Sequence, residues 1–113
     1  MRRALGRQLQ ILGFNVSVFE SAEELLAREF PTDNACLLLD VYMAGMNGIE
    51  LCRSLDASGR HLPTILMSAR DDRATRQIMR QVRPVAEIFK PFDEKILLRV
   101  IGKALRNGRN LPH

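Results

Sequence analysis

The sequence predicts an α/β domain built on a parallel sheet with helices on both faces. Short apolar runs alternate along the chain with amphipathic stretches of helical spacing, and two of the runs are almost continuously apolar. Strands that alternate with helices pair in parallel through right-handed crossovers, so the helices cover both faces of the sheet. A nearly continuous apolar run is typical of a strand that is buried on both faces.

Each expected element rests on a local pattern of apolar side chains and turn residues. Residues 14–19 alternate apolar and polar side chains, as a strand does, whereas residues 35–41 and 63–68 are nearly continuous apolar runs. A capping box of Ser21 and Glu24 opens the second helix. The expected order is helix 4–12, strand 14–19, helix 21–30 before Pro31, strand 35–41, helix 49–55, strand 63–68, helix 71–83, strand 85–89 and, after the cap Asp93, helix 94–106.

The apolar positions of the last two helices predict which of their faces turn inward. Helical spacing places three apolar side chains on one face of helix 71–83, and six on one face of the last helix. The opposite faces carry basic side chains at intervals of three and four. The expected inward residues are Ala74, Ile78 and Val82, followed by Ile96, Leu97, Val100, Ile101, Ala104 and Leu105.

Length and composition indicate one small cytoplasmic domain. The chain has 113 residues, enough for one modest core. No apolar run approaches the roughly 20 residues that a membrane span needs, which predicts no membrane association. The N-terminal stretch MRRALGRQLQ lacks the apolar segment of a secretory signal. Cys36 and Cys52 are therefore expected to be reduced, buried thiols.

The net charge of +4 raises the question of nucleic-acid binding. The basic residues are spread through the chain, and two helices carry them as stripes. Exposed charges are individually weak, so a solvated face is the ordinary interpretation, and an acidic partner or nucleic acid is the alternative. His61 and His113 have no ligand-like spacing, which predicts no metal role for them. The stripes are Arg73, Arg76, Arg80 and Arg83, then Lys95, Arg99, Lys103 and Arg106.

Three expected strands end in a polar side chain that a buried strand would not otherwise tolerate: Asp40, Ser68 and Lys90. In an open parallel sheet, functional groups gather at the carboxyl ends of the strands. An ionised Asp can attack phosphorus, a Lys supplies a point charge to phosphoryl oxygens, and a Ser adds a hydrogen bond. Any one of these residues alone would be read as a strand end facing water, but the three together predict a phosphoryl-handling site.

Four segments carry a specific resemblance to the receiver domains of response regulators. LLLDVYMAGMNGIEL resembles the phosphoacceptor strand, loop and helix of that family, and ILMSA resembles its strand with the switch hydroxyl. FKPFDEKILL resembles the Lys-Pro strand end before the last helix, and FESAEELL resembles the second helix of a subgroup that often precedes a helix-turn-helix output domain. The resemblance covers essentially the whole chain and implies a flavodoxin-like, CheY-like fold in a two-component phosphorelay.

By that resemblance each anchor residue has a role. Asp40 is expected to be the phosphoacceptor, Ser68 the switch hydroxyl and Lys90 the phosphate-binding lysine, with a cis bond to Pro91. The resemblance implies a Mg2+ cofactor, held here by Asp40 and the backbone carbonyl of Tyr42. It further implies a histidine kinase as phosphoryl donor, and an output domain or partner protein contacted through residues 71–106.

The chain departs from the family at its start. Receivers begin with a central strand that ends in a pair of acidic magnesium ligands, but Met1 falls at the start of the first helix. The expected fold is therefore a receiver at residues 1–108 that lacks the first central strand, with four strands, five helices and a tail at 109–113. Weakened Mg2+ binding and a homo-oligomer that fills the gap are expected. The simplest explanation is a misassigned start or a trimmed sequence, and nucleic-acid binding is expected only through a lost C-terminal domain.

Two smaller differences bear on the site. The strand before Lys90 places Glu87 or Ile88 where an aromatic switch residue usually sits in the family. Asp71 and Asp72 follow Ser68 on the same rim and are expected to cap the next helix, with metal binding as the less favoured alternative.

Three functions remain to be compared. A receiver that accepts phosphate on Asp40 agrees with the three retained anchors, and a receiver-like interaction module with impaired phosphorylation agrees with the missing acidic pair. A phosphohydrolase of the haloacid-dehalogenase type needs a second Asp two residues after the nucleophile, where this chain has Tyr42. The sequence therefore does not predict an enzyme.

Overall fold

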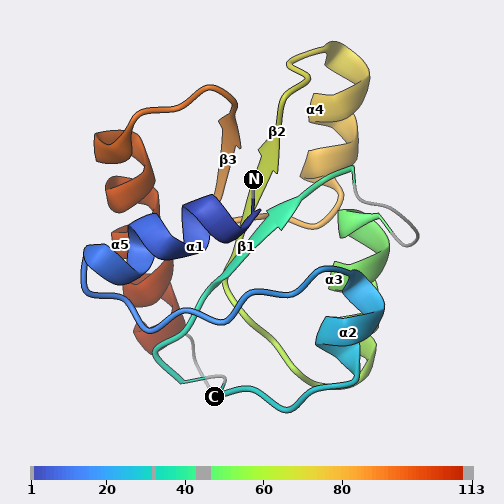
Figure 1. The fold of residues 1–113 in the computed structure, drawn as a ribbon. Coiled ribbons are helices and arrows are strands. Elements are labelled where there is room, and N and C mark those ends of the chain that lie inside the picture. Colours follow the sequence, from blue (N-terminus) through green and yellow to red (C-terminus); the bar gives the residue numbers. More distant parts are fainter. Residues whose placement is uncertain (1, 32, 43–46, 111–113) are drawn as a thin grey trace.

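The computed structural model describes residues 2–31, 33–42 and 47–110, which form one parallel sheet and five helices around it (Figure 1). The strands are β1 (Leu37–Asp40), β2 (Thr64–Ser68) and β3 (Ala86–Phe89), hydrogen-bonded in the order β1-β2-β3. No helix in these ranges is both long and apolar enough to cross a membrane. The helices are α1 (Arg2–Ile11), α2 (Ala22–Leu26), α3 (Gly48–Ala57), α4 (Arg73–Arg80) and α5 (Glu94–Asn110).

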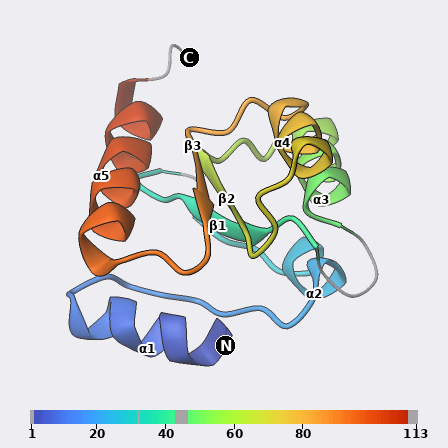
Figure 2. The ribbon, with the colours of Figure 1, turned by 90° about the horizontal axis from the view of Figure 1, so that it is seen from above.

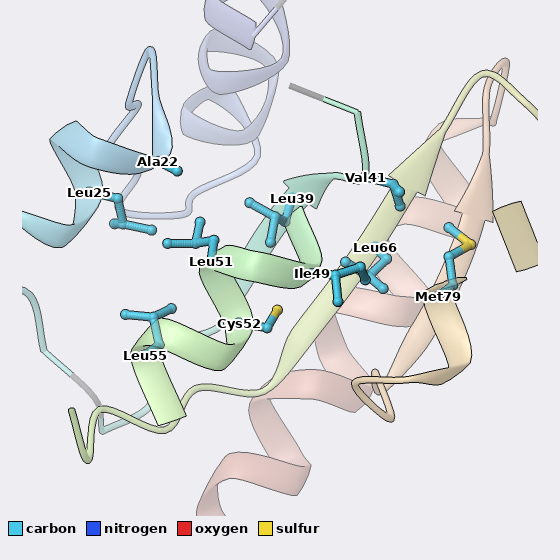
Figure 3. Close-up of a cluster of buried hydrophobic side chains, with 10 residues drawn as sticks. All are labelled: Ala22, Leu25, Leu39, Val41, Ile49, Leu51, Cys52, Leu55, Leu66 and Met79. Atoms are coloured by element: carbon cyan, nitrogen blue, oxygen red, sulfur yellow. The ribbon is translucent and has the colours of Figure 1, made fainter. Parts of the chain in front are cut away.

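Helices cover both faces of the sheet, as predicted (Figure 2). Side chains of α2, α3 and α4 pack with Leu39 and Leu66 on one face, where Leu66 is fully buried (Figure 3). Side chains of α1 and α5 pack with Ile65 and Met67 on the other face. The central strand β2 therefore separates two apolar clusters, and its alternate residues contribute to each of them.

The prediction of a strand at residues 14–19 is wrong. The segment is irregular, and the sheet of the described residues has three strands instead of four. The segment is extended between α1 and α2 and passes β1 without pairing with it (Figure 1). A strand exists only when a neighbouring strand takes up its backbone hydrogen bonds. No described strand forms a ladder with these residues, so their alternating pattern produces an extended segment without strand pairing.

The strand β1 is less buried than its apolar sequence predicts, because it lies at the edge of the described sheet. The run from residue 35 to 41 is apolar enough for burial on both faces, yet Leu37 and Leu38 are only half-buried, whereas β2 is buried over residues 65–68. The register Leu37↔Thr64 to Asp40↔Met67 gives β1 one neighbour only. The apolar run therefore predicted that β1 is a central strand, whereas β1 lies at the edge of the sheet in the described part of the chain.

Helix bounds and faces also differ in detail. Ser21 caps α2 as predicted by accepting the Glu24 backbone N–H, but the helix ends at Leu26 rather than at Pro31. On α4 the fully buried positions are Thr75 and Met79. The predicted Ile78 and Val82 are half-buried and pack against the same core cluster, but the predicted Ala74 is exposed. On α5 Leu97, Ile101 and Ala104 are buried as predicted, but Ile96 is exposed.

Candidate phosphoryl-handling site

The three polar strand ends come together at one edge of the sheet because parallel strands in register end side by side. Asp40 is the last residue of β1, Ser68 is the last of β2, and Lys90 follows Phe89 at the end of β3. The backbone N–H of Val41 donates to the Met67 carbonyl and that of Lys90 to the Ser68 carbonyl, at 2.9 and 2.8 Å. These two bonds carry the ladder one residue beyond the strands and fix the three positions relative to one another.

The side chains of Asp40 and Lys90 form an ion pair. The Lys90 Nζ donates to the Asp40 Oδ1 at 2.7 Å, across the intervening strand β2, and each side chain is 19% exposed. A charge-assisted hydrogen bond of this length and burial is among the stronger polar contacts that a protein makes. The peptide bond between Lys90 and Pro91 is cis.

The Ser68 hydroxyl lies at the buried end of β2, with 3% of the residue exposed. Its Oγ accepts the backbone N–H of Arg70 at 2.9 Å, so the loop after β2 folds back onto it. A hydroxyl that accepts one bond still has its own hydrogen to donate. Ser68 can therefore donate to a phosphoryl oxygen placed at this edge.

The turn that follows β1 is held by a helix cap and by a close backbone approach. Asn47 caps α3 by accepting the Glu50 N–H at 2.9 Å, and the Glu50 carboxylate reaches back to the Asn47 N–H. A Cβ on Gly48 would lie 2.7 Å from the backbone oxygen of Asp40, closer than real Cβ contacts. Only glycine therefore allows α3 to begin so close to Asp40. Residues 43–46 lie outside the described part of the chain.

A polar link from β1 to α4 was not anticipated from the sequence. The Tyr42 hydroxyl is 2.8 Å from the Thr75 Oγ1, and Thr75 is fully buried in α4. Thr75 shares helical spacing with Met79 and Val82, so an alternative apolar stripe was present in the sequence. The Arg70 guanidinium lies 5.1 Å from the centre of the Tyr42 ring. Arg70, in the loop bonded to Ser68, thus contacts Tyr42, which lies two residues after β1 and is linked to Thr75 of α4.

The two acidic residues after Ser68 act on α4, as the sequence predicted for a cap. Asp72 accepts the Thr75 N–H at 2.7 Å, and its hydrogen bonds to Thr75 and then to Arg70 lower the pKa of its carboxyl. Asp71 pairs with Arg76, and that hydrogen bond raises the pKa of the guanidinium. Arg76 also lies 4.7 Å from the centre of the Phe89 ring, so α4 is held against β3 beside Lys90.

The cysteines are free thiols remote from this chemistry. Burial raises the pKa of Cys36 from its ordinary 9.0 to about 11, and that of Cys52 to about 11 as well. Cys52 is buried and Cys36 is half-buried beside β1. Because the thiolate is the reactive form, neither thiol is a good nucleophile near neutral pH.

Comparison with known proteins identifies the family of this chain. The sequence profile described as "Response regulator receiver domain" matches residues 1–102. The chain belongs to this family. A receiver domain is a signalling module of two-component systems and not a catalytic enzyme.

Related receivers extend over nearly all of this chain. It is 28% identical to the transcriptional regulatory protein FixJ of Azorhizobium caulinodans, covering 96% of this chain and 54% of that protein. It is 33% identical to the response regulator MprA of Mycobacterium leprae, covering 96% of this chain and 48% of that protein. The receiver therefore spans about half the length of these curated relatives.

Solved structures give the same fold. The response regulator StyR superimposes with a TM-score of 0.84 at 33% identity, covering 96% of this chain and 55% of that one. The structure titled FixJ-N superimposes with a TM-score of 0.79 at 29% identity, covering 99% of this chain and 87% of that one. The α/β, CheY-like architecture predicted from the sequence is confirmed.

Receivers typically bind Mg2+, so the oxygen atoms around Asp40 are compared with the ligands that this ion needs. Magnesium takes oxygen ligands, commonly one or two carboxylates with waters and phosphate oxygens. In the described residues the Asp40 carboxylate is engaged by Lys90 at 2.7 Å, and no group of three His, Cys, Asp or Glu side chains suited to a metal is found there. The Tyr42 carbonyl adds one neutral oxygen at most. This donor set does not by itself fit a magnesium ion.

Proposed function

We propose that this receiver accepts a phosphoryl group on Asp40 from a histidine kinase and changes its partner contacts in response. The observation that carries the proposal is the 2.7 Å contact between Lys90 Nζ and Asp40 Oδ1. It brings a carboxylate nucleophile and a cation for phosphoryl oxygens to the same buried edge. The proposed roles are phosphoacceptor for Asp40, phosphate-binding lysine for Lys90 and switch hydroxyl for Ser68.

The transfer is a displacement at phosphorus. An Asp40 carboxylate oxygen forms the new O–P bond while the N–P bond to the kinase imidazole breaks, and the imidazole nitrogen keeps the electron pair and takes a proton from solvent. Lys90 moves its ammonium from the Asp40 oxygen to the transferred phosphoryl oxygens, where it offsets their charge. The Ser68 hydroxyl donates to a third oxygen.

The response passes through the loop after β2. In the unphosphorylated structure the Ser68 Oγ accepts the backbone N–H of Arg70 at 2.9 Å. When Ser68 turns to the phosphoryl group, this hydrogen bond breaks. Arg70 then loosens from the Tyr42 ring, and the bond from Tyr42 to Thr75 transmits the change to α4. The partner surface lies within residues 71–106, where exposed arginines suit an acidic partner or output domain.

A phosphorylation experiment tests the proposal. The protein is incubated with acetyl phosphate, with and without Mg2+, and intact mass is recorded for the original sequence, for Asp40→Asn and for the exposed matched control Asp56→Asn. Gain of one phosphoryl group in the original and in Asp56→Asn, but not in Asp40→Asn, is expected. The variant Ser68→Ala is expected to gain the phosphoryl group as well. Its α4 amides are expected to keep the chemical shifts of the unphosphorylated protein, because the proposed response to α4 passes through the Ser68 hydroxyl. Labelling that survives Asp40→Asn would refute the assignment.

A second candidate is an interaction module that binds its partner without phosphorylation. The Asp40 carboxylate is already paired with Lys90, and the described residues hold no group of three side chains suited to a metal, which favours this candidate. The same experiment separates the two, because absence of any mass gain in Mg2+ supports the module and efficient labelling eliminates it. Self-association of the chain remains a prediction, which sedimentation velocity over a range of concentrations tests.

A further inference from the structure

The outer face of α5 carries a line of positively charged side chains, named the α5 stripe. All of them are exposed, and at about 100° per residue they lie within about 80° of one another around the helix. The buried residues Leu97, Ile101 and Ala104 lie on the opposite side. Figure 2 shows α5 on the outer side of the sheet, so the stripe points into solvent. Its members are Lys95, Arg99, Lys103 and Arg106.

The cations of the α5 stripe have no ion-pair partner among the described residues. On α4, by contrast, Arg76 pairs with Asp71. The one acid within residues 94–106 is Glu94, which lies about 100° around the helix from Lys95. The α5 stripe is therefore positive charge that the described part of the chain does not neutralise, and this distinguishes α5 from α4.

Interactions within the helix do not explain the α5 stripe. Like charges that are three or four residues apart on a helix repel, and every neighbouring pair in the stripe has that spacing. Lys95 lies in the first turn of α5, where the helix dipole disfavours a cation. The dipole favours cations only near the C-terminal end. A bound anion from outside the chain offsets both unfavourable terms.

The shape and surroundings of the stripe favour a nucleic-acid duplex over an acidic protein. From Lys95 to Arg106 the stripe extends about 16 Å along the helix axis. A DNA duplex carries one negative charge per about 1.7 Å of its axis, so about ten phosphates lie over that length and each cation meets one in any register. Protein interfaces have an apolar centre, but Ile96 is the one large apolar side chain exposed on the described part of α5.

We propose that the α5 stripe binds the phosphate backbone of double-stranded nucleic acid without reading its sequence. Contacts to phosphates position a protein on a duplex, whereas contacts to base edges specify the sequence. The stripe offers cations only and has no aromatic ring for base stacking. This contact lies on the receiver itself, whereas the sequence led us to expect nucleic-acid binding through a C-terminal domain. It is separate from α4, through which the proposed response to phosphorylation passes.

Fluorescence anisotropy with a short fluorescein-labelled DNA duplex tests the proposal. The full chain is titrated into the duplex at several salt concentrations and without a phosphoryl donor, so the result does not depend on phosphorylation of Asp40. Contacts to four phosphates predict a slope of about −3.6 for log K against log salt, which makes binding about a hundredfold weaker at 200 mM than at 50 mM salt. A duplex of scrambled sequence is expected to bind equally. A slope near zero would overturn the proposal.

Charge-removing variants separate the stripe from the net charge of the chain. Arg99→Gln with Lys103→Gln removes two charges of the stripe, and Arg73→Gln with Arg80→Gln removes two from exposed residues of α4 as the matched control. The first is expected to weaken binding at least about tenfold and to reduce the slope by about 1.8, and the control to weaken it less than about threefold. Arg99→Lys with Lys103→Arg keeps both charges and is expected to keep binding. Equal losses in the two double variants would show that net charge alone attracts the duplex and would contradict the proposal.

Lysine acetylation locates the bound duplex. The lysines of the chain are Lys90, Lys95 and Lys103, and Lys90, paired with Asp40, is the internal reference. The duplex is expected to slow acetylation of Lys95 and Lys103 and to leave that of Lys90 unchanged. Binding without this protection would place the duplex elsewhere. Release of the duplex by poly-glutamate at the same concentration of charge would assign the stripe to an acidic polypeptide instead.

Discussion

The ion pair between Asp40 and Lys90 makes a direct prediction about stability. Lys90→Met removes the ammonium but keeps most of the side-chain length, and Asp40→Asn removes the negative charge at constant shape. Each single variant removes this contact from a remaining side chain that is four-fifths buried, because both side chains are only 19% exposed. The double variant removes both charges, so the cycle isolates the energy of the pair from the cost of each substitution.

The expected magnitude follows from the geometry. At 2.7 Å and an effective dielectric constant of about 20, the gross attraction between unit charges is about 6 kcal/mol. Desolvation of the two ions cancels most of it. Hydrogen bonds to charged groups contribute about 1.5–3 kcal/mol net, and partial exposure places this pair near the lower value. We expect Lys90→Met to cost about 2 kcal/mol and the coupling energy to be about 1.5 kcal/mol.

Urea unfolding followed by circular dichroism measures these quantities. The original chain, both single variants and the double variant are compared at neutral pH, with m-values checked for constancy. Lys103→Met, an exposed lysine of α5, is the matched control and is expected to change stability by less than about 0.5 kcal/mol. A coupling energy below about 0.5 kcal/mol would show that the contact is solvated and would refute the reasoning about burial.

Three further predictions concern Gly48 and Asn47 at the start of α3 and the thiol of Cys36. Gly48→Ala is expected to cost about 1–3 kcal/mol in urea unfolding, because its Cβ would lie 2.7 Å from the Asp40 carbonyl, and a neutral effect would contradict this close approach. Asn47→Ala is expected to cost about 1 kcal/mol through loss of the α3 cap, whereas Asn47→Asp keeps the acceptor and should stay near the original stability. Cys36 is expected to react slowly with iodoacetamide at pH 8 and faster as the pH approaches its raised pKa of about 11, so a rate that levels off near pH 9 would be inconsistent with burial. The raised pKa of Cys36 also predicts that the free energy of unfolding falls as the pH rises from about 9 to about 11. In that range the thiol has released its proton in the unfolded chain but still holds it in the folded chain.

Local sequence patterns correctly predicted the strands and helix caps whose hydrogen-bonding partners lie among the described residues. The runs at 37–40, 64–68 and 86–89 became strands because each has a parallel neighbour, and β2 is buried on both faces as its continuous apolar run requires. Ser21 and Asp72 cap helices through acceptors three residues from the bonded N–H, a purely local geometry. The cap at Asn47 has the same sequence signature, with Glu50 three residues on, and could have been found in the same way.

Patterns failed where the outcome depended on residues distant in the sequence. The segment 14–19 has the alternation of a strand but no hydrogen-bonding neighbour, and alternation cannot supply one. On α4 two overlapping sets of positions had helical spacing. Packing of Met79 in the core cluster with Leu66, and the contact of Thr75 with Tyr42, decided that Thr75 and Met79 point inward rather than Ala74. Ile96 is 41% exposed although Leu97, in the same first turn of α5, is buried, so Ile96 lies outside the inward face of the helix.

The sequence alone therefore determined the fold class, the family and the three polar strand ends, because strand ends in a parallel sheet lie at one edge whatever the details of packing. The tertiary structure alone decided that Lys90 reaches across β2 to Asp40, since the register of three strands sets that distance. It also decided that, among the described residues, β1 pairs with β2 alone, because pairing depends on the presence of a neighbour and not on the strand's own residues.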